Sequence, residues 1–194
     1  MTRAIMRSAV LLLALAAPAQ PQGSAPMSAA TATPAPAHVT NSFDFEIAAP
    51  FARLAPLFGP EAERAWAGEH WDPVFLYPHP AKDTQGAVFT IQHGAHTAVW
   101  INTLFDLPSG RMQYVYVIPD RLATTIDVSL HAIDATHTAV HVTYSRTALN
   151  PAANDDVKAR GEADRNSGPE WKQGLEACLR LEHGTDSPYH GSRP

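Results

Sequence analysis

Apolar and polar positions alternate along several stretches of the chain, and each such stretch predicts a strand that is buried on one face. In residues 39–47, Phe43, Phe45 and Ile47 alternate with two acidic residues. Further strands, separated by short turns rich in Gly, Pro and Asp, are expected in quick succession at 87–92, 97–105, 112–118, 121–133 and 139–149. This spacing predicts an antiparallel meander.

The last predicted hairpin has enough alternation to suggest a register. We predict one that pairs Leu130 with Val142, Val128 with Tyr144, and Ala132 with Val140. One face then gathers Ile126, Val128, Leu130, Val140, Val142 and Tyr144. The other face gathers Thr125, Asp127, Ser129, His131, His141, Thr143, Ser145 and Thr147. A slip of one residue would mix the two sets, so we expect one covered face and one solvent face.

Two short helices are expected after the first strand. Pro50 suits a first helical position, apolar residues follow at helical spacing, and Gly59-Pro60 ends the segment. A second helical turn is expected within residues 61–67. The aromatic and proline-rich segment 66–80 is predicted to be an ordered loop.

A long C-terminal helix is expected to cover the sheet. Asn150 is a good helix cap and Pro151 suits the first turn. Ser167-Gly168-Pro169 should kink or restart this helix, and Gly184 should end it. After the kink, an apolar stripe at helical spacing comprises Trp171, Leu175, Cys178 and Leu179. The predicted fold class is α+β, a curved antiparallel sheet wrapped around this long helix.

The two ends of the chain have a different character. Residues 1–19 resemble a secretory signal peptide, with Arg3 and Arg7 before an apolar run too short to span a bilayer. Residues 20–37 form an Ala/Pro-rich segment expected to be a flexible linker, and residues 185–194 a flexible tail. The domain is then 38–184, and the protein is expected to be periplasmic or secreted. If Met27 is the true start, it is cytoplasmic.

Composition excludes several classes of function. Across 194 residues the formal charge is −5, which argues against a nucleic-acid partner because such partners need a basic face. A single cysteine excludes a disulfide framework. No metal-ligand motif, phosphate loop or nucleophile motif occurs, so we expect no metal, no cofactor and no recognisable catalytic constellation. The mature chain is expected to have no integral membrane segment.

Several short sequences resemble the START-like, polyketide cyclase superfamily (SRPBCC), whose fold is the helix-grip. They are 63–66 (ERAW), 71–73 (WDP), 87–90 (AVFT), Trp100, 117–120 (VIPD), 143–144 (TY), 147–149 (TAL) and Trp171. The resemblance implies a cavity between sheet and C-terminal helix that holds an apolar or amphipathic small molecule, and no universal catalytic residue. One departure is that 154–166 has Val157 as its only large aliphatic. Two explanations are open: that half of the helix is more exposed than in relatives, or the ligand is smaller or more polar than usual.

The candidate ligand-binding residues lie on the covered face of the sheet and on the apolar helix stripe. They are Trp100, Val128, Val142, Tyr144, Arg146, Trp171 and Leu175. The guanidinium of Arg146 suits a carboxylate or phenolate. The alternative for Arg146 is that its side chain extends to solvent or forms an ion pair with Asp155, Asp156 or Asp164. The alternative for the tryptophans is core packing.

Three functions stay open at this point. The first is an exported carrier or binder of a small hydrophobic or aromatic molecule. The second is a polyketide cyclase/dehydratase-like enzyme, with Tyr144 and Arg146 as acid/base candidates in the same cavity. The third is a structural or partner-binding module without a pocket. The oligomeric state is not predicted.

Overall fold

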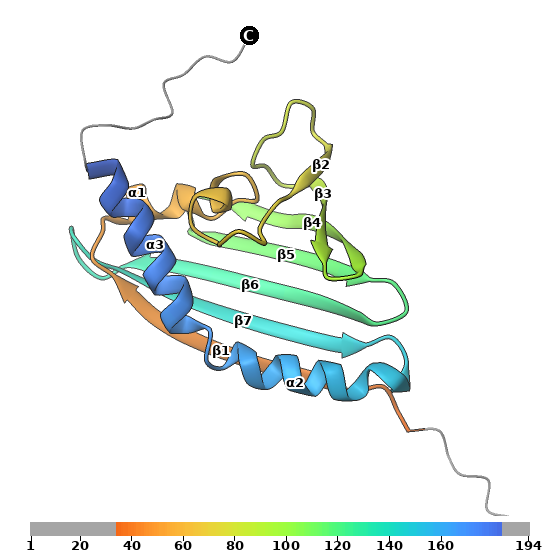
Figure 1. Cartoon of the computed structure of the whole chain (residues 1–194). Helices are drawn as coiled ribbons and strands as arrows, with labels where there is room; N and C mark the ends of the chain where they lie inside the picture. Colours follow the sequence, from red (N-terminus) through yellow and green to blue (C-terminus); the bar gives the residue numbers. More distant parts are fainter. Residues whose placement is uncertain (1–33, 184–194) are drawn as a thin grey trace, which may run out of the picture. The chain divides into compact units, whose positions relative to one another are not determined.

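A computed structural model describes residues 34–183, and its framework is one antiparallel sheet (Figure 1). The strands are β1 (His38–Ile47), β2 (Val74–Tyr77), β3 (Val88–His93), β4 (His96–Asp106), β5 (Arg111–Ile118), β6 (Leu122–Ala132) and β7 (Thr138–Ala148). Their order is β1-β7-β6-β5-β4-β3-β2, so the first strand closes against the last. The predicted meander is confirmed. The signal peptide, most of the linker, Gly184 and the tail lie outside the described residues.

The helical segments form the second layer. They are α1 (Phe51–Leu54), η1 (Ala55–Leu57), η2 (Ala62–Ala65), η3 (Pro151–Ala153), α2 (Asn154–Asp164) and α3 (Gly168–His183), where η denotes a 3-10 helix. Short helices after the first strand and a helical C-terminal segment match the predicted helix-grip arrangement. α3 crosses the sheet, whereas α2 runs along the edge formed by β1 and β7 (Figure 1).

The predicted hairpin register is wrong by two residues, although its two faces are correct. The structure pairs Leu130 with Val140 and Val128 with Val142. The turn is tighter than expected because the Asp134 carboxylate accepts hydrogen bonds from the backbone N–H groups of Thr136 and His137, at 2.6 and 2.8 Å. A shift of two residues leaves every side chain on its own face, so the apolar pattern alone could not detect it.

The segment 66–80 was predicted as a loop, but part of it is the edge strand β2. Phe75 anchors this strand because its ring is buried and stacks on Phe89, with 5.6 Å between ring centroids. The flanking Pro73 and Pro78 keep the strand to four residues, as expected at a sheet edge. The aromatic composition reflects packing against β3.

The C-terminal segment is two helices, with the break where Ser167-Gly168-Pro169 predicts it. The polar half, α2, approaches the sheet edge closely, because Val157 is fully buried and Gly161 has no side chain. A Cβ on Gly161 would lie 2.8 Å from Val39 and 2.9 Å from Asn41. Helix α2 therefore packs on the edge of the sheet through a few residues, such as Val157 and Gly161, and its other positions can be polar.

Candidate binding pocket

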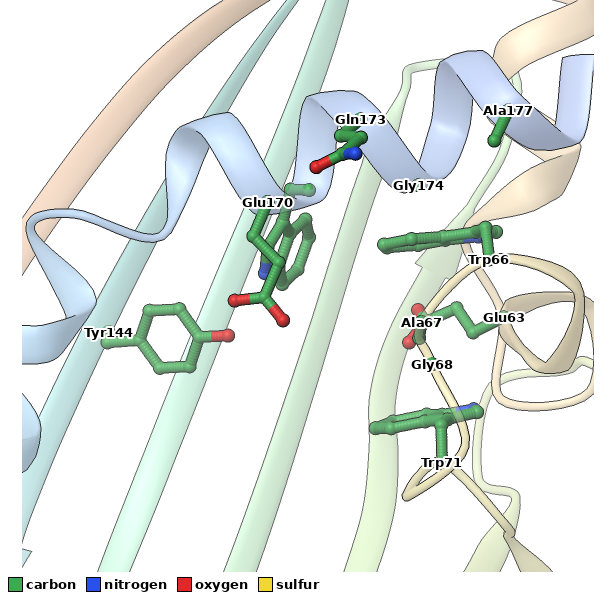
Figure 2. Close-up of a pocket in the computed structure, with 11 residues that line it drawn as sticks. Glu63, Trp66, Ala67, Gly68, Trp71, Tyr144, Glu170, Gln173, Gly174 and Ala177 are labelled. Atoms are coloured by element: carbon green, nitrogen blue, oxygen red, sulfur yellow. The ribbon is translucent and has the colours of Figure 1, made fainter.

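A pocket of about 460 Å³ opens between α3, strand β7 and the segment that begins at η2. η2 and the loop after it supply Glu63, Trp66, Ala67, Gly68 and Trp71. β7 supplies Tyr144, and α3 supplies Glu170, Trp171, Gln173, Gly174 and Ala177. Figure 2 shows Tyr144 on one side of the pocket and Glu63, Trp66 and Trp71 on the opposite side. Helix α3 runs above the space between them.

Three tryptophans give the pocket rigid aromatic walls. The indole N–H of Trp66 donates to the carbonyl of Leu57, and that of Trp71 to the carbonyl of Pro60, both at 2.8 Å. The ring of Trp66 meets Trp171 edge-on, with 5.3 Å between ring centroids. Because their polar atoms are already bonded, the rings of Trp66 and Trp71 are held in place and offer apolar surface to a ligand.

Glycine at position 174 sets the spacing between α3 and the loop. A Cβ there would lie 2.5 Å from the carbonyl oxygen of Trp66, which is closer than real contacts allow. The backbones of helix and loop therefore approach directly, and this approach places Trp66 against the pocket.

We expect Gly174→Ala to destabilise the protein by about 1–3 kcal/mol, a typical cost of forcing atoms into a packed site. This cost outweighs the gain of about 1 kcal/mol in helix propensity. Urea unfolding measures it, with Gln173→Ala on the same helix as the control. Unchanged or higher stability of Gly174→Ala would show that the loop moves away freely.

Glu63 places a carboxyl group inside the pocket. Its side chain is almost completely buried, at 4% exposure, and the Tyr114 hydroxyl donates to its Oε1 at 2.7 Å. Burial raises the pKa of Glu63 to about 8; the bond from Tyr114 opposes this rise and the charge of Asp83 adds to it. At neutral pH, Glu63 is therefore mainly an uncharged carboxylic acid.

Tyr144 faces Glu63 from the sheet, and its hydroxyl points into the cavity (Figure 2). No hydrogen bond joins this hydroxyl to any residue within 34–183. Burial raises the pKa of Tyr144, so the phenol keeps its proton. The Arg146 guanidinium lies over its ring, 4.7 Å from the centroid. Tyr144 thus offers a neutral group that both donates and accepts hydrogen bonds.

The structure brings two of the seven predicted ligand residues, Tyr144 and Trp171, to this pocket. The other five are not among its lining residues. Trp100 is buried and stacks on Tyr116, with 4.2 Å between ring centroids. Val128, Val142 and Leu175 are buried in the core. A ligand contact by these four residues stays a prediction.

Arg146 has the alternative role considered from the sequence, an ion pair with α2. Its Nε and one terminal nitrogen each lie 2.6 Å from an oxygen of Asp164, which makes the pair bidentate. The other terminal nitrogen donates to Tyr116 and Thr124. Because both charged residues are buried, this guanidinium is occupied by the protein itself, and its ligand contact stays a prediction.

Sequence reasoning did not single out Glu63 as a functional residue; it noted Glu63 only within the ERAW sequence. One signal could have found it. Glu63, Trp66 and Ala67 are spaced as one face of a helical turn, and the other two members of that face are apolar. A carboxylate on an apolar face is a candidate for a shifted pKa.

Residues 34–183 contain no group of three or more His, Cys, Asp or Glu side chains arranged to hold a metal ion. Cys178 is buried on α3. None of the helices in this range has the length and apolar character needed to cross a bilayer.

The order and arrangement of the elements define the fold. A curved antiparallel sheet with short helices after its first strand and a C-terminal helix across it is the helix-grip fold of the START-like, polyketide cyclase superfamily (SRPBCC). The resemblance noted from the sequence is confirmed at the level of the fold.

Several solved structures are similar to this chain in fold. Norcoclaurine synthase from Thalictrum flavum, solved with dopamine and hydroxybenzaldehyde, is 12% identical, with a TM-score of 0.54 over 78% of this chain and 91% of its own. The Zhui aromatase/cyclase from a Streptomyces species is 15% identical, with a TM-score of 0.53 over 78% and 99%. A protein from Thermobifida fusca is 20% identical, with a TM-score of 0.54 over 76% and 97%. No protein-family model and no curated protein matches the sequence.

Proposed function

We propose that the protein binds a small, planar, largely apolar molecule in the pocket beside α3. The observation that carries this proposal is the lining itself, in which three tryptophans are among the residues around a space of about 460 Å³. This volume is in the range of small-molecule pockets, which are mostly apolar with a few placed polar groups. Here the polar groups that face each other are Glu63 and Tyr144 (Figure 2). A pocket of this volume argues against the third function considered from the sequence, a structural or partner-binding module without a pocket.

A second function, acid/base catalysis in the same pocket, is favoured by one observation. The structure places a titratable carboxyl group, Glu63, among the lining residues. Glu63 is a better acid/base candidate than Tyr144 and Arg146, the two residues suggested by the sequence. Arg146 is bound to Asp164, and the raised pKa of Tyr144 makes its phenol a poor acid. A cyclase/dehydratase-like reaction would use Glu63 as the proton donor.

Filling part of the pocket should weaken ligand binding and leave the fold intact. Ala177 faces the cavity from α3, so Ala177→Leu adds apolar volume there without weakening the helix. We expect calorimetric titration with planar aromatics and fatty acids to show binding to the wild type and at least a tenfold loss in this variant, about 1.4 kcal/mol. Lys172→Leu, on the same helix outside the pocket, is the control. Equal binding by Ala177→Leu and wild type would place the ligand elsewhere.

We also propose that the protein is exported and that residues 1–19 are removed. The support is the order of the features in the sequence, in which Arg3 and Arg7 precede the apolar run 9–17 and the small-residue pattern Ala17-Pro18-Ala19. Expression of the full chain in a bacterium, followed by fractionation and N-terminal sequencing, tests this. A mature chain that begins near residue 20 in the periplasm or medium is expected. An intracellular chain that begins at Met1 would contradict export, and initiation at Met27 would support the cytoplasmic alternative.

A further inference from the structure

The carboxyl group of Glu63 has one oxygen committed and one free. Oε1 accepts the hydrogen bond from Tyr114 on β5. No residue within 34–183 forms a hydrogen bond with Oε2. The side chain is 96% buried, and Figure 2 shows its carboxyl group on the cavity side, between the rings of Trp66 and Trp71. Oε2 is not one of the fully buried side-chain atoms that lack a partner, so it borders the open space of the cavity, where a ligand atom can form a hydrogen bond with it.

Burial is the main reason why Glu63 keeps its proton, and no cation within residues 34–183 faces it to oppose that effect. Tyr114 approaches from β5, Tyr144 from β7 and Glu170 from α3, while Asp83 adds a negative charge from the loop before β3. These groups are phenols and carboxyls, and none is a cation. The neighbouring Arg64 is engaged away from the pocket, with its guanidinium on Asp72 and Glu61. An ionised carboxylate at this position would therefore lack compensation, and the neutral acid is favoured.

We propose that Glu63 recognises its ligand as a hydrogen-bond donor, and that the ligand is an aromatic molecule carrying a carbonyl oxygen, such as an aryl ketone, aldehyde or ester. The inference rests on the proposed function and specifies its ligand class. Because Oε1 already accepts from Tyr114, the acid proton resides on Oε2 and points toward the bound molecule. A carbonyl oxygen only accepts hydrogen bonds, so it matches this donor. The aromatic part then lies against the indole rings.

A matched pair of probes tests the donor role. Acetophenone and ethylbenzene share a phenyl ring and differ in the carbonyl oxygen. At pH 6 we expect acetophenone to bind roughly five- to tenfold more tightly, the range for one hydrogen bond in a pocket. This preference should disappear as the pH is raised from 7 to 9.5, because ionisation of Glu63 removes the proton. Binding is measured by the shifts of the tryptophan indole N–H signals in NMR spectra.

Three variants separate hydrogen-bond donation by the side chain at position 63 from the effects of its charge and its shape. Glu63→Gln retains an N–H donor at the same position, so it should keep the preference and lose its pH dependence. Glu63→Met retains the length of the side chain without a donor, so it should bind both probes equally at every pH. Glu69→Gln removes an exposed carboxylate from the same loop and should behave as the wild type.

Two results would overturn the inference while leaving the pocket function intact. One is equal affinity for acetophenone and ethylbenzene at pH 6, with the same indole signals shifted by both. The other is tighter binding of benzylammonium than of acetophenone at pH 6, which would show that Glu63 is ionised. Failure of every probe to shift the indole signals would instead contradict the proposed function itself.

Discussion

Replacing Asp164 by asparagine should destabilise the protein by about 3–5 kcal/mol, the usual cost of removing one partner from a buried ion pair. The substitution leaves the guanidinium of Arg146 buried, at 6% exposure, without its counter-charge. Both bidentate hydrogen bonds, each 2.6 Å long, are weakened or lost. The loss also weakens the attachment of the end of α2 to β7, because this pair joins that end of the helix to the strand. This loss is a large fraction of the stability of about 5–15 kcal/mol that is typical of a folded domain.

Urea unfolding followed by circular dichroism measures this effect. The control is Glu162→Gln on the same helix, whose pair with Arg165 is exposed and is expected to contribute less than about 1 kcal/mol. In the double variant Arg146→Met/Asp164→Leu, no charge is left buried, so most of the lost stability should return. Loss of less than about 1 kcal/mol in Asp164→Asn would mean that Arg146 reaches solvent.

Glu63→Gln should make the protein more stable than the wild type at pH 8. This advantage in stability should become smaller as the pH is lowered. In the unfolded chain Glu63 ionises near its ordinary pKa of 4.5, whereas in the folded protein it keeps its proton to about pH 8. The folded state therefore binds the extra proton between these values, and wild-type stability falls as the pH rises through this window. The whole shift corresponds to at most about 5 kcal/mol. Glutamine does not titrate, so its variant avoids this loss.

The measurement is urea unfolding of both proteins at pH 4, 6 and 8. The stability difference, variant minus wild type, should rise by a few kcal/mol across this range, and Glu69→Gln should show no comparable trend. A difference that stays constant with pH would show that Glu63 has an ordinary pKa. That result would also remove the basis for a neutral hydrogen-bond donor in the pocket.

The strands could be predicted from the sequence because alternation reports burial directly. Phe43, Phe45 and Ile47 in β1 are all buried, as their spacing predicts. Alternation does not report which residue pairs with which, and the register of the last hairpin depended on the Asp134 turn. β2 escaped detection because its single buried anchor, Phe75, lies between prolines.

The pocket was only partly predictable, for a similar reason. Tyr144 and Trp171 lie on regular elements, so their faces follow from spacing along β7 and α3. Glu63 and Trp71 reach the pocket from short helical and loop segments, whose path depends on contacts such as the bond from Trp71 to Pro60. The role of Arg146 depended on the position of α2 at the sheet edge, which only the tertiary structure provides.

The most direct test of the account is to follow the four tryptophan indole N–H signals by NMR while a planar aromatic such as acetophenone is added. The account predicts saturable shifts of the signals from Trp66, Trp71 and Trp171, which line the pocket, with the smallest shift at Trp100, which does not. Shifts confined to Trp100, or no saturable shift at any of the four, would contradict a ligand pocket beside α3.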